Sequence, residues 1–382
     1  MSWDNILGQE RIKLILSNAI KNNRISSSYL FTGIEGIGKD YIAIEFAKIV
    51  NCENKFNKND IIYSCDKCKS CVTFDNLSNE NLILIYSLPT VKSSSKSDDP
   101  IQNLDEKQLL ELKSQLNLKI ENKYHKITLL GANNIKVNSV RDLKKKLSFA
   151  SANAGRKFII ILNAEEMTSE ASNAFLKTLE EPNDNITIIL VTSTPEVILQ
   201  TIKSRCQEII FAPIENSLII SNLINKFNKS SEEANLIANF AQGSLSKCLD
   251  FIDEDIQNLR TEIVTLLRTT VKRKYKIELM SQIESLTAAK DKNKLEIALK
   301  LLIIWLRDVE VYIKTEDQNL IINKDQIEII AKFSKVFNNS NFNILLLEIE
   351  KTITMIFQNV SLNIALTSLF LKIRENLLGN ME

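Results

Sequence analysis

The chain has 382 residues, of which 44% are hydrophobic and 25% are charged, and its formal net charge is +1. These values are ordinary for a globular protein, and a chain of this length can form two or three domains. The near-neutral charge excludes a uniformly basic surface of the kind that coats nucleic acid, although it leaves a local basic patch open.

No apolar run in the sequence is long enough to cross a bilayer. The first residues, Met1-Ser-Trp-Asp4, include no basic segment that leads into an apolar one, as a secretory signal would. We therefore expect a cytoplasmic protein without a membrane partner, in which thiols stay reduced.

The first expected elements are a helix over 9–20, a strand over 29–32 and a helix over 41–50. A glycine-rich loop, Gly33-Ile-Glu-Gly-Ile-Gly-Lys-Asp40, joins that strand to the second helix. This arrangement is typical of a phosphate-binding loop, in which backbone N–H groups and a lysine hold phosphates at the amino end of a helix. Gly33, Gly36, Gly38 and Lys39 fit the pattern.

The position after Lys39 departs from the pattern, because it carries Asp40 where Ser or Thr would bind Mg²⁺. A carboxylate about 5 Å from a phosphate repels it by roughly 3 kcal/mol at an effective dielectric near 20. We expect weakened nucleotide binding unless Asp40 itself holds a bridging Mg²⁺.

Four cysteines after this helix have the spacing of a metal site. Cys65, Cys68 and Cys71 follow one another at C-x2-C-x2-C, and Cys52 lies shortly upstream. Two-residue gaps let a tight turn present its sulfurs to one ion, so we expect a structural Zn²⁺ knuckle over 52–71 with no open position for catalysis. An iron–sulfur cluster and coincidental thiols are the alternatives.

The elements beyond the knuckle alternate between strands and helices. We expect a buried strand at 81–86, a polar exposed loop at 90–100, a surface helix at 104–118, an amphipathic helix at 135–149, a strand at 158–162, a helix at 169–179, and strands at 185–191 and 208–211. Such alternation predicts an α/β fold with a parallel sheet covered on both faces. After residue 213 the pattern is helical, with a small helical domain to about 255 and a helical bundle beyond it.

The strand expected at 158–162 ends without the acidic residues that hold a metal and activate water in nucleotide hydrolases. Leu162 cannot hold a metal's water shell, and Asn163 cannot accept a proton at neutral pH. Glu165 and Glu166 are the nearest carboxylates, but they lie beyond the strand end. We expect no self-sufficient ATP hydrolysis.

Several motifs are together similar to bacterial clamp-loader subunits of the AAA+ superfamily. They are Ile6-Leu-Gly-Gln-Glu10, the four-cysteine insert, the run Leu176-Lys-Thr-Leu-Glu-Glu-Pro182 and the triplet Ser204-Arg-Cys206. The resemblance covers residues 1–255 by motif and the rest by helical character alone. It implies an AAA+ core with its zinc knuckle over 1–212, a helical lid over 213–255 and an oligomerising helical collar over 256–382.

Within this family the chain most resembles the delta prime branch, whose members often lose the loop hydroxyl, the acidic pair or both. The resemblance implies that Arg205 is an arginine finger for ATP on a neighbouring subunit; the alternative is an arginine that only caps the sheet. The implied partners are gamma/tau and delta subunits in a hetero-pentamer and, through that complex, the sliding clamp and primed DNA. The segment at about 90–126 exceeds the family's usual link and is either a lineage insertion or a loop with its own partner.

Other interpretations stay open at this point. The loop is expected to be a structural turn without nucleotide, with weak ATP or ADP binding without turnover as the alternative. An active gamma/tau-like ATPase and a zinc-bearing DNA-binding scaffold are the competing functions. The basic segments at 141–147 and 272–276 could contact a DNA backbone, although a solvated face is the simpler interpretation.

Overall fold

The computed structural model describes residues 3–89, 99–148, 155–180, 185–252, 255–358 and 360–379. Most of the polar loop expected at 90–100, and the last two residues of the motif that ends at Pro182, lie outside the described residues. The chain divides into two compact units, one of residues 1–222 with 241–249 and one of residues 223–240 with 250–382. The segment 213–255 thus contributes to both, and a separate lid stays a prediction.

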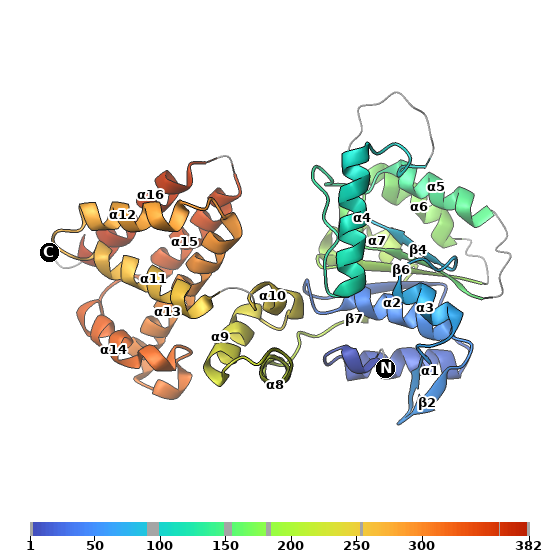
Figure 1. Ribbon diagram of the computed structural model, residues 1–382, viewed down its shortest axis with the longest axis horizontal. Coiled ribbons are helices and arrows are strands. Elements are labelled where there is room, and N and C mark those ends of the chain that lie inside the picture. Colours follow the sequence, from blue (N-terminus) through green and yellow to red (C-terminus); the bar gives the residue numbers. More distant parts are fainter. Residues whose placement is uncertain are drawn as a thin grey trace. The chain divides into compact units, whose positions relative to one another are not determined.

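A five-stranded parallel sheet lies at the centre of the first unit (Figure 1). Its order is β4-β5-β6-β1-β7, with β4 at Leu82–Ile85, β5 at Lys157–Ile161, β6 at Ile186–Thr192, β1 at Ser28–Thr32 and β7 at Gln207–Ile210. Because parallel strands end at one edge of a sheet, the loops that follow β1, β5 and β6 meet there, where ligands bind in open α/β sheets.

Helices cover both faces of this sheet, which explains why its strands other than the edge strand β7 are largely apolar. On one face Phe46 of α2 (Lys39–Val50) packs edge to face against Tyr29 and Phe158, with ring centroids 5.9 and 5.6 Å apart. On the other face α5 (Val137–Ser148), α6 (Ser169–Glu180) and α7 (Gln200–Lys203) share one apolar cluster with the strands. The α/β fold predicted from the alternating pattern is confirmed.

The amphipathic helix expected at 135–149 corresponds to α5. Val140 and Leu143 are buried in the cluster beneath the sheet, whereas Arg141 and Lys145 are exposed. The side chain of Leu147 lies outside the described residues.

The remaining elements of the first unit surround the sheet. They are η1 (Trp3–Asn5), α1 (Glu10–Lys21), the antiparallel hairpin of β2 (Phe56–Lys58) and β3 (Ile61–Tyr63), α3 (Lys69–Asp75), α4 (Glu106–Glu121), η2 (Ala164–Glu166), η3 (Pro195–Val197) and α10 (Leu245–Asp250), with α8 (Asn216–Phe227) at the boundary. The long helix α4 belongs to the segment expected as an insert. Asp105 caps it, because its carboxylate accepts from the backbone N–H of Gln108, whose side chain accepts from Asp105 in return.

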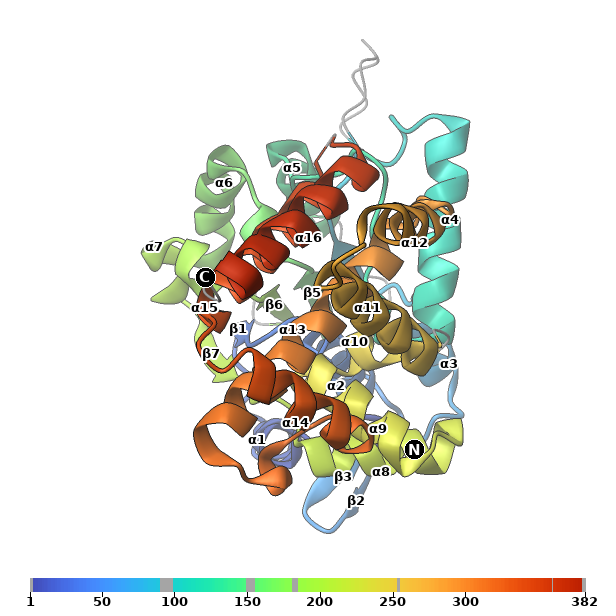
Figure 2. The same cartoon turned by 90° about the vertical axis from the view of Figure 1, so that its left-hand side faces the viewer.

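The described residues of the second unit contain helices and no strand (Figure 2). Beyond α9 (Ser231–Ala241) these are α11 (Ile256–Thr270), α12 (Lys276–Thr287), α13 (Lys292–Thr315), η4 (Gln318–Leu320), η5 (Lys324–Gln326), α14 (Ile327–Val336), α15 (Phe342–Ile356) and α16 (Leu362–Gly379). Helix α13 packs against α11, α14 and α15, and its fully buried Trp305 donates to the side chain of Gln326 at 2.9 Å. None of the helices that the structure describes is both long and apolar enough to span a membrane.

Lys48 joins α2 to the chain that follows it. Its side chain is buried, and its Nζ lies 2.8 Å from Asp75, 2.9 Å from Asp66 and 3.6 Å from the buried Glu45. Burial alone would lower the pKa of Lys48, but the carboxylates of Glu45, Asp66 and Asp75 raise it above its ordinary value. The ammonium therefore stays charged and holds α2, α3 and the cysteine segment together.

We expect Lys48→Met to lower the free energy of unfolding by about 3 kcal/mol or more, because the buried Glu45 loses a counter-charge. Urea denaturation of the full chain measures this change. Lys21→Met is the control, since Lys21 pairs with the exposed Asp60 and its loss should leave the midpoint almost unchanged. Equal midpoints for both variants would contradict the structural role of Lys48.

Candidate functional site

The glycine-rich loop lies between β1 and α2, at the edge where the parallel strands end. Gly36 and Gly38 have φ angles of +77° and +91°, which favour glycine, and Gly38 caps α2. The carbonyl of Gly36 accepts from the backbone N–H of Ser246 at 3.1 Å, and a Cβ added at Gly36 would lie 1.9 Å from the Ser246 hydroxyl oxygen. The loop therefore has the predicted strand–loop–helix setting and is closely covered by the start of α10.

Lys39 is directed back onto its own loop. Its Nζ donates to the carbonyls of Gly33 and Ile34, each at 2.7 Å, and lies 3.3 Å from the hydroxyl of Ser193. Burial lowers the pKa of Lys39 to about 8, against the opposing effect of nearby carboxylates led by Asp40. The three donors of this ammonium are thus used within the protein.

Asp40 forms an ion pair with Lys119 of α4, whose side chain is fully buried. The same ammonium also donates to the carbonyls of Lys123 and His125, at 2.7 and 2.8 Å. Lys119 therefore offsets the charge of Asp40, so the repulsion of phosphate that we expected from Asp40 does not by itself decide whether nucleotide binds.

The chain after α4 returns across the front of the loop. The ring of Tyr124 packs edge to face on Tyr41, with centroids 5.4 Å apart, and a Cβ added at Gly38 would lie 3.0 Å from this ring. Lys126 pairs with Glu35 of the loop at 2.6 Å. The insert therefore supplies side chains to the site itself.

The strand β5 ends at the site in the way that the sequence suggested. Leu162 and Asn163 both line the pocket beside the loop. Glu165 lies beyond them and accepts from the backbone N–H of Ser193 at 3.1 Å, while Glu166 accepts from the hydroxyl of Ser87 at 2.5 Å. One oxygen of each carboxylate thus accepts a hydrogen bond from the protein, while the other oxygen of Glu165 is buried without a hydrogen-bond partner among the residues that the structure describes.

The pocket at this edge has a cavity volume of about 50 Å³. Its lining combines the loop, the ends of β5 and β6, the start of α10, Tyr124 and Lys126 of the insert, and Ile127, which follows the insert. Pockets for drug-sized ligands are about 300–1,000 Å³. In this conformation the loop and the chain around Tyr124 leave little free space beside Lys39.

Arg205 lies just after α7 on the surface of the first unit. Its guanidinium donates to the carbonyl of Thr201 at 2.9 Å and to the carboxylate of Glu180, at the end of α6, also at 2.9 Å. Both charged side chains are partly exposed. An exposed ion pair of this kind contributes about 0–1 kcal/mol, so the guanidinium can exchange Glu180 for another anion at little cost.

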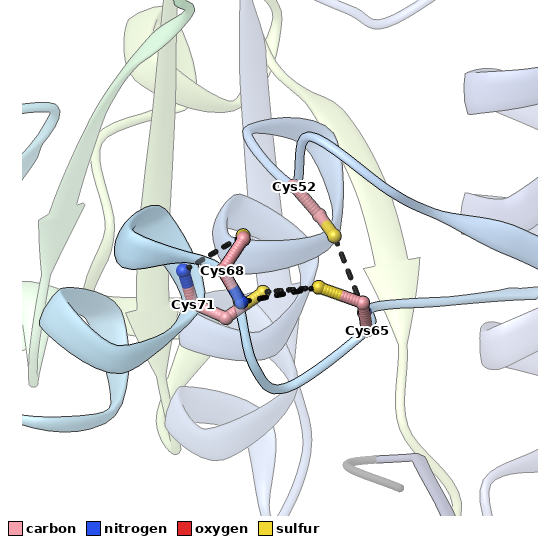
Figure 3. Close-up of side chains that lie close together, drawn as sticks. All are labelled: Cys52, Cys65, Cys68 and Cys71. Carbon is pink, nitrogen blue, oxygen red and sulfur yellow. Dashed lines mark hydrogen bonds between the residues drawn. The ribbon is translucent and has the colours of Figure 1, made fainter.

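The four predicted cysteines converge in one cluster beside α3 (Figure 3). All four Sγ atoms lie within 4.8 Å of one another. Tetrahedral zinc with Zn–S bonds of about 2.3 Å places its sulfurs about 3.8 Å apart, so small side-chain adjustments would close the shell. The donor set fits a structural metal, and neither Cys206 nor Cys248 belongs to it.

Backbone N–H groups already orient these sulfurs. The N–H of Cys65 donates to the sulfur of Cys52 at 3.2 Å (Figure 3). In the same way the N–H of Cys68 donates to the sulfur of Cys65 at 3.3 Å, and the N–H of Cys71 donates to the sulfur of Cys68 at 3.4 Å. Donors from Lys67 and Cys68 lower the pKa of the Cys65 thiol to about 6, whereas burial raises the pKa of Cys71. Thiolate is the form that binds metal, and N–H donation to sulfur favours that form.

In the basic segment at 272–276, two side chains have contacts within their own unit, and Arg273, Lys274 and Lys276 are exposed. Lys272 pairs with Glu278 at 2.7 Å, and the guanidinium of Arg374 lies 4.1 Å from the ring centre of Tyr275. This arrangement is compatible with the simpler interpretation of a solvated face.

Sequence reasoning missed Lys119, Tyr124 and Lys126 as residues of the site. They lie 79 to 91 residues from the loop positions that they contact, and no spacing rule connects the two segments. The unusual length of the insert was the one available signal, and it indicated a special role without indicating where the insert packs.

Comparison with known proteins identifies the family. The family model described as "DNA polymerase III, delta subunit" matches residues 8–215, more than half of the chain. The DNA polymerase III subunit delta' of Bacillus subtilis is 25% identical over 311 residues, which cover 81% of this chain and 80% of that protein. The DNA polymerase III subunit tau of the same organism is 29% identical over 259 residues.

The alignment with subunit tau covers 66% of this chain but 38% of tau, so the chain spans well under half of that relative. Among solved structures, a gamma subunit-related protein of Thermotoga maritima aligns with 95% of this chain and 99% of its own, at 14% identity and a TM-score of 0.46. The assignment comes from the family model, supported by the delta' relative: the chain belongs to the bacterial DNA polymerase III clamp-loader family.

Proposed function

We propose that this protein is a non-hydrolysing, delta prime-like subunit of the clamp loader that helps to load the sliding clamp onto primed DNA. The observation that carries the proposal is the pocket beside Lys39. Leu162 and Asn163 stand where hydrolysis needs carboxylates, and the free space is about 50 Å³. A subunit with this pocket contributes to the complex through its surfaces and not through turnover of its own.

Arg205 is the group that we propose to act in trans. Its guanidinium is exposed and held by a replaceable partner, Glu180. On assembly it would exchange this carboxylate for the terminal phosphate of ATP on a neighbouring subunit, where a planar guanidinium stabilises the charge of the transition state. DNA contact would then trigger hydrolysis at that neighbour and allow the clamp to close.

The cysteine cluster is proposed to hold one structural Zn²⁺. Four thiolates close a tetrahedral shell and leave no position for water, so the ion would supply rigidity and no catalysis. Cys65 to Cys71 span Asp66, which pairs with Lys48 of α2, so the knuckle would also steady the helix that follows the glycine-rich loop.

The proposed partners are gamma/tau and delta subunits in a cytoplasmic hetero-pentamer, with the sliding clamp and primed DNA engaged through the complex. The second candidate function is an active gamma/tau-like ATPase, which the similarity to subunit tau favours. The two differ in what the isolated chain does with ATP.

We expect the isolated full chain to hydrolyse no ATP above background, with or without primed DNA, because no carboxylate at the end of β5 can activate water. A phosphate-release assay measures this, with Lys39→Ala as the comparison. Turnover that disappears in Lys39→Ala would establish the gamma/tau-like alternative.

Arg205→Ala should lower the DNA-stimulated ATPase rate of the reconstituted complex, since arginine fingers contribute about 10³–10⁵-fold at the site they serve. The decrease in the ATPase rate should equal the contribution that this one ATP site makes to the rate of the whole complex. Gel filtration should show that the complex still assembles normally. Lys203→Ala, one position before Ser204-Arg205, is the control and should keep the full rate. A fully assembled Arg205→Ala complex with an unchanged rate would rule out the finger.

Elemental analysis of the purified full chain should find about one zinc per molecule, and Cys68→Ser should reduce this content by removing one of four ligands. Cys206→Ser removes a thiol outside the cluster and should leave the content unchanged. Absence of metal from the wild-type chain purified without chelator would refute the knuckle.

A further inference from the structure

The segment that follows α4 places three side chains in the pocket beside the glycine-rich loop. Tyr124, Lys126 and Ile127 line the pocket together with Gly36 and Lys39. The Tyr124 ring lies very close to Gly38, the residue that caps α2. A Cβ added at Gly38 would be only 3.0 Å from an atom of this ring. The amino end of α2, which holds phosphates in such loops, is therefore covered by an aromatic ring.

Polar contacts fix this segment at both sides of the ring. The hydroxyl of Tyr124, whose side chain is 8% exposed, accepts from the backbone N–H of Leu7 at 3.2 Å. On one side Lys119 pairs with Asp40, and on the other Lys126 pairs with Glu35 at 2.6 Å. Each of the two acidic positions of the loop thus has a lysine of the insert as its partner.

Both buried lysines of the site also have all their donors in use. The ammonium of Lys119 has three donors, which Asp40 and the carbonyls of Lys123 and His125 accept. The three donors of Lys39 are used by the loop carbonyls and Ser193. A nucleotide that approached Lys39 would have to displace several of these contacts before it could bind.

We propose that residues 119–127 are the resident occupant of the pocket, and that Asp40, Lys119, Tyr124 and Lys126 together replace bound nucleotide and exclude it. This inference deepens the proposed function and rests on it, because both assume a loop that does not turn over ATP. In this arrangement Asp40, which stands where phosphate-binding loops carry Ser or Thr, binds Lys119.

The first test compares binding of fluorescent mant-ADP with Mg²⁺ to four forms of the full chain. Wild type and Tyr124→Phe, which keeps the ring, should bind no nucleotide at millimolar concentration. Tyr124→Ala/Lys126→Ala should bind at least about tenfold more tightly than wild type, equivalent to about 1.4 kcal/mol. Lys113→Ala, an exposed lysine on α4, is the matched control and should behave as wild type.

Two results of this test would overturn the inference. One is tight binding of mant-ADP by the wild-type chain, and the other is a folded Tyr124→Ala/Lys126→Ala variant that gains no binding. Wild-type binding without hydrolysis would leave the proposed function standing, whereas hydrolysis by the isolated wild-type chain would remove the proposed function as well. The two failures are therefore distinguishable.

A second measurement decides the matter if the double variant does not fold. In a double-mutant cycle, Asp40→Ser and Lys119→Met should each lower the denaturation midpoint, because each leaves the partner charge uncompensated. The variant with both changes should recover at least half of the summed shift. Purely additive shifts would show that Asp40 and Lys119 do not act as a pair and would overturn the inference.

Discussion

The ion pair between Asp40 and Lys119 is the contact on which the arrangement of the site depends. A buried ammonium is costly unless all its donors are used, and here a carboxylate and two carbonyls use them. The pair brings the end of α4 to the first turn of α2, and the chain beyond it then carries Tyr124 and Lys126 across the loop. The state of the nucleotide pocket therefore follows from an interaction between two segments far apart in the sequence.

The two positively charged groups considered for phosphate chemistry differ in their surroundings. Lys39 is buried, bonded to its own loop and has its pKa lowered to about 8 by that burial. Arg205 is partly exposed and bonded to an exposed carboxylate. Reorganising Lys39 would disturb a packed site, whereas Arg205 can change partner at the surface. This contrast is what a subunit needs if it assists a neighbour's chemistry and performs none.

Ion pairs connect the cysteine segment to α2, the helix that follows the glycine-rich loop. Lys48 of α2 binds Asp66, which lies between the first and second cysteines of the triplet, and Asp75, which ends α3. Lys123 of the insert donates in turn to the carbonyl of Asp75. The cysteine cluster, α2 and the insert thus form one network, so a metal bound at the cysteines would stabilise the same region that lines the pocket.

Local chemistry made much of this protein predictable from its sequence. Continuous apolar runs predicted the strands, because a parallel sheet is buried on both faces, and the glycine spacing predicted the strand–loop–helix turn. The C-x2-C-x2-C spacing predicted the sulfur cluster, because short turns fix the distances between such residues. The sequence also shows directly that Leu162 and Asn163, and not carboxylates, end the strand at 158–162.

The tertiary structure alone decided how the pocket is filled. Asp40 and Lys119 are 79 positions apart, and the charge of each is visible in the sequence while their contact is not. Pairing across such a separation depends on the packing of α4, and no local periodicity encodes that packing. The sequence therefore determined which groups this loop lacks, and the fold determined what stands in their place.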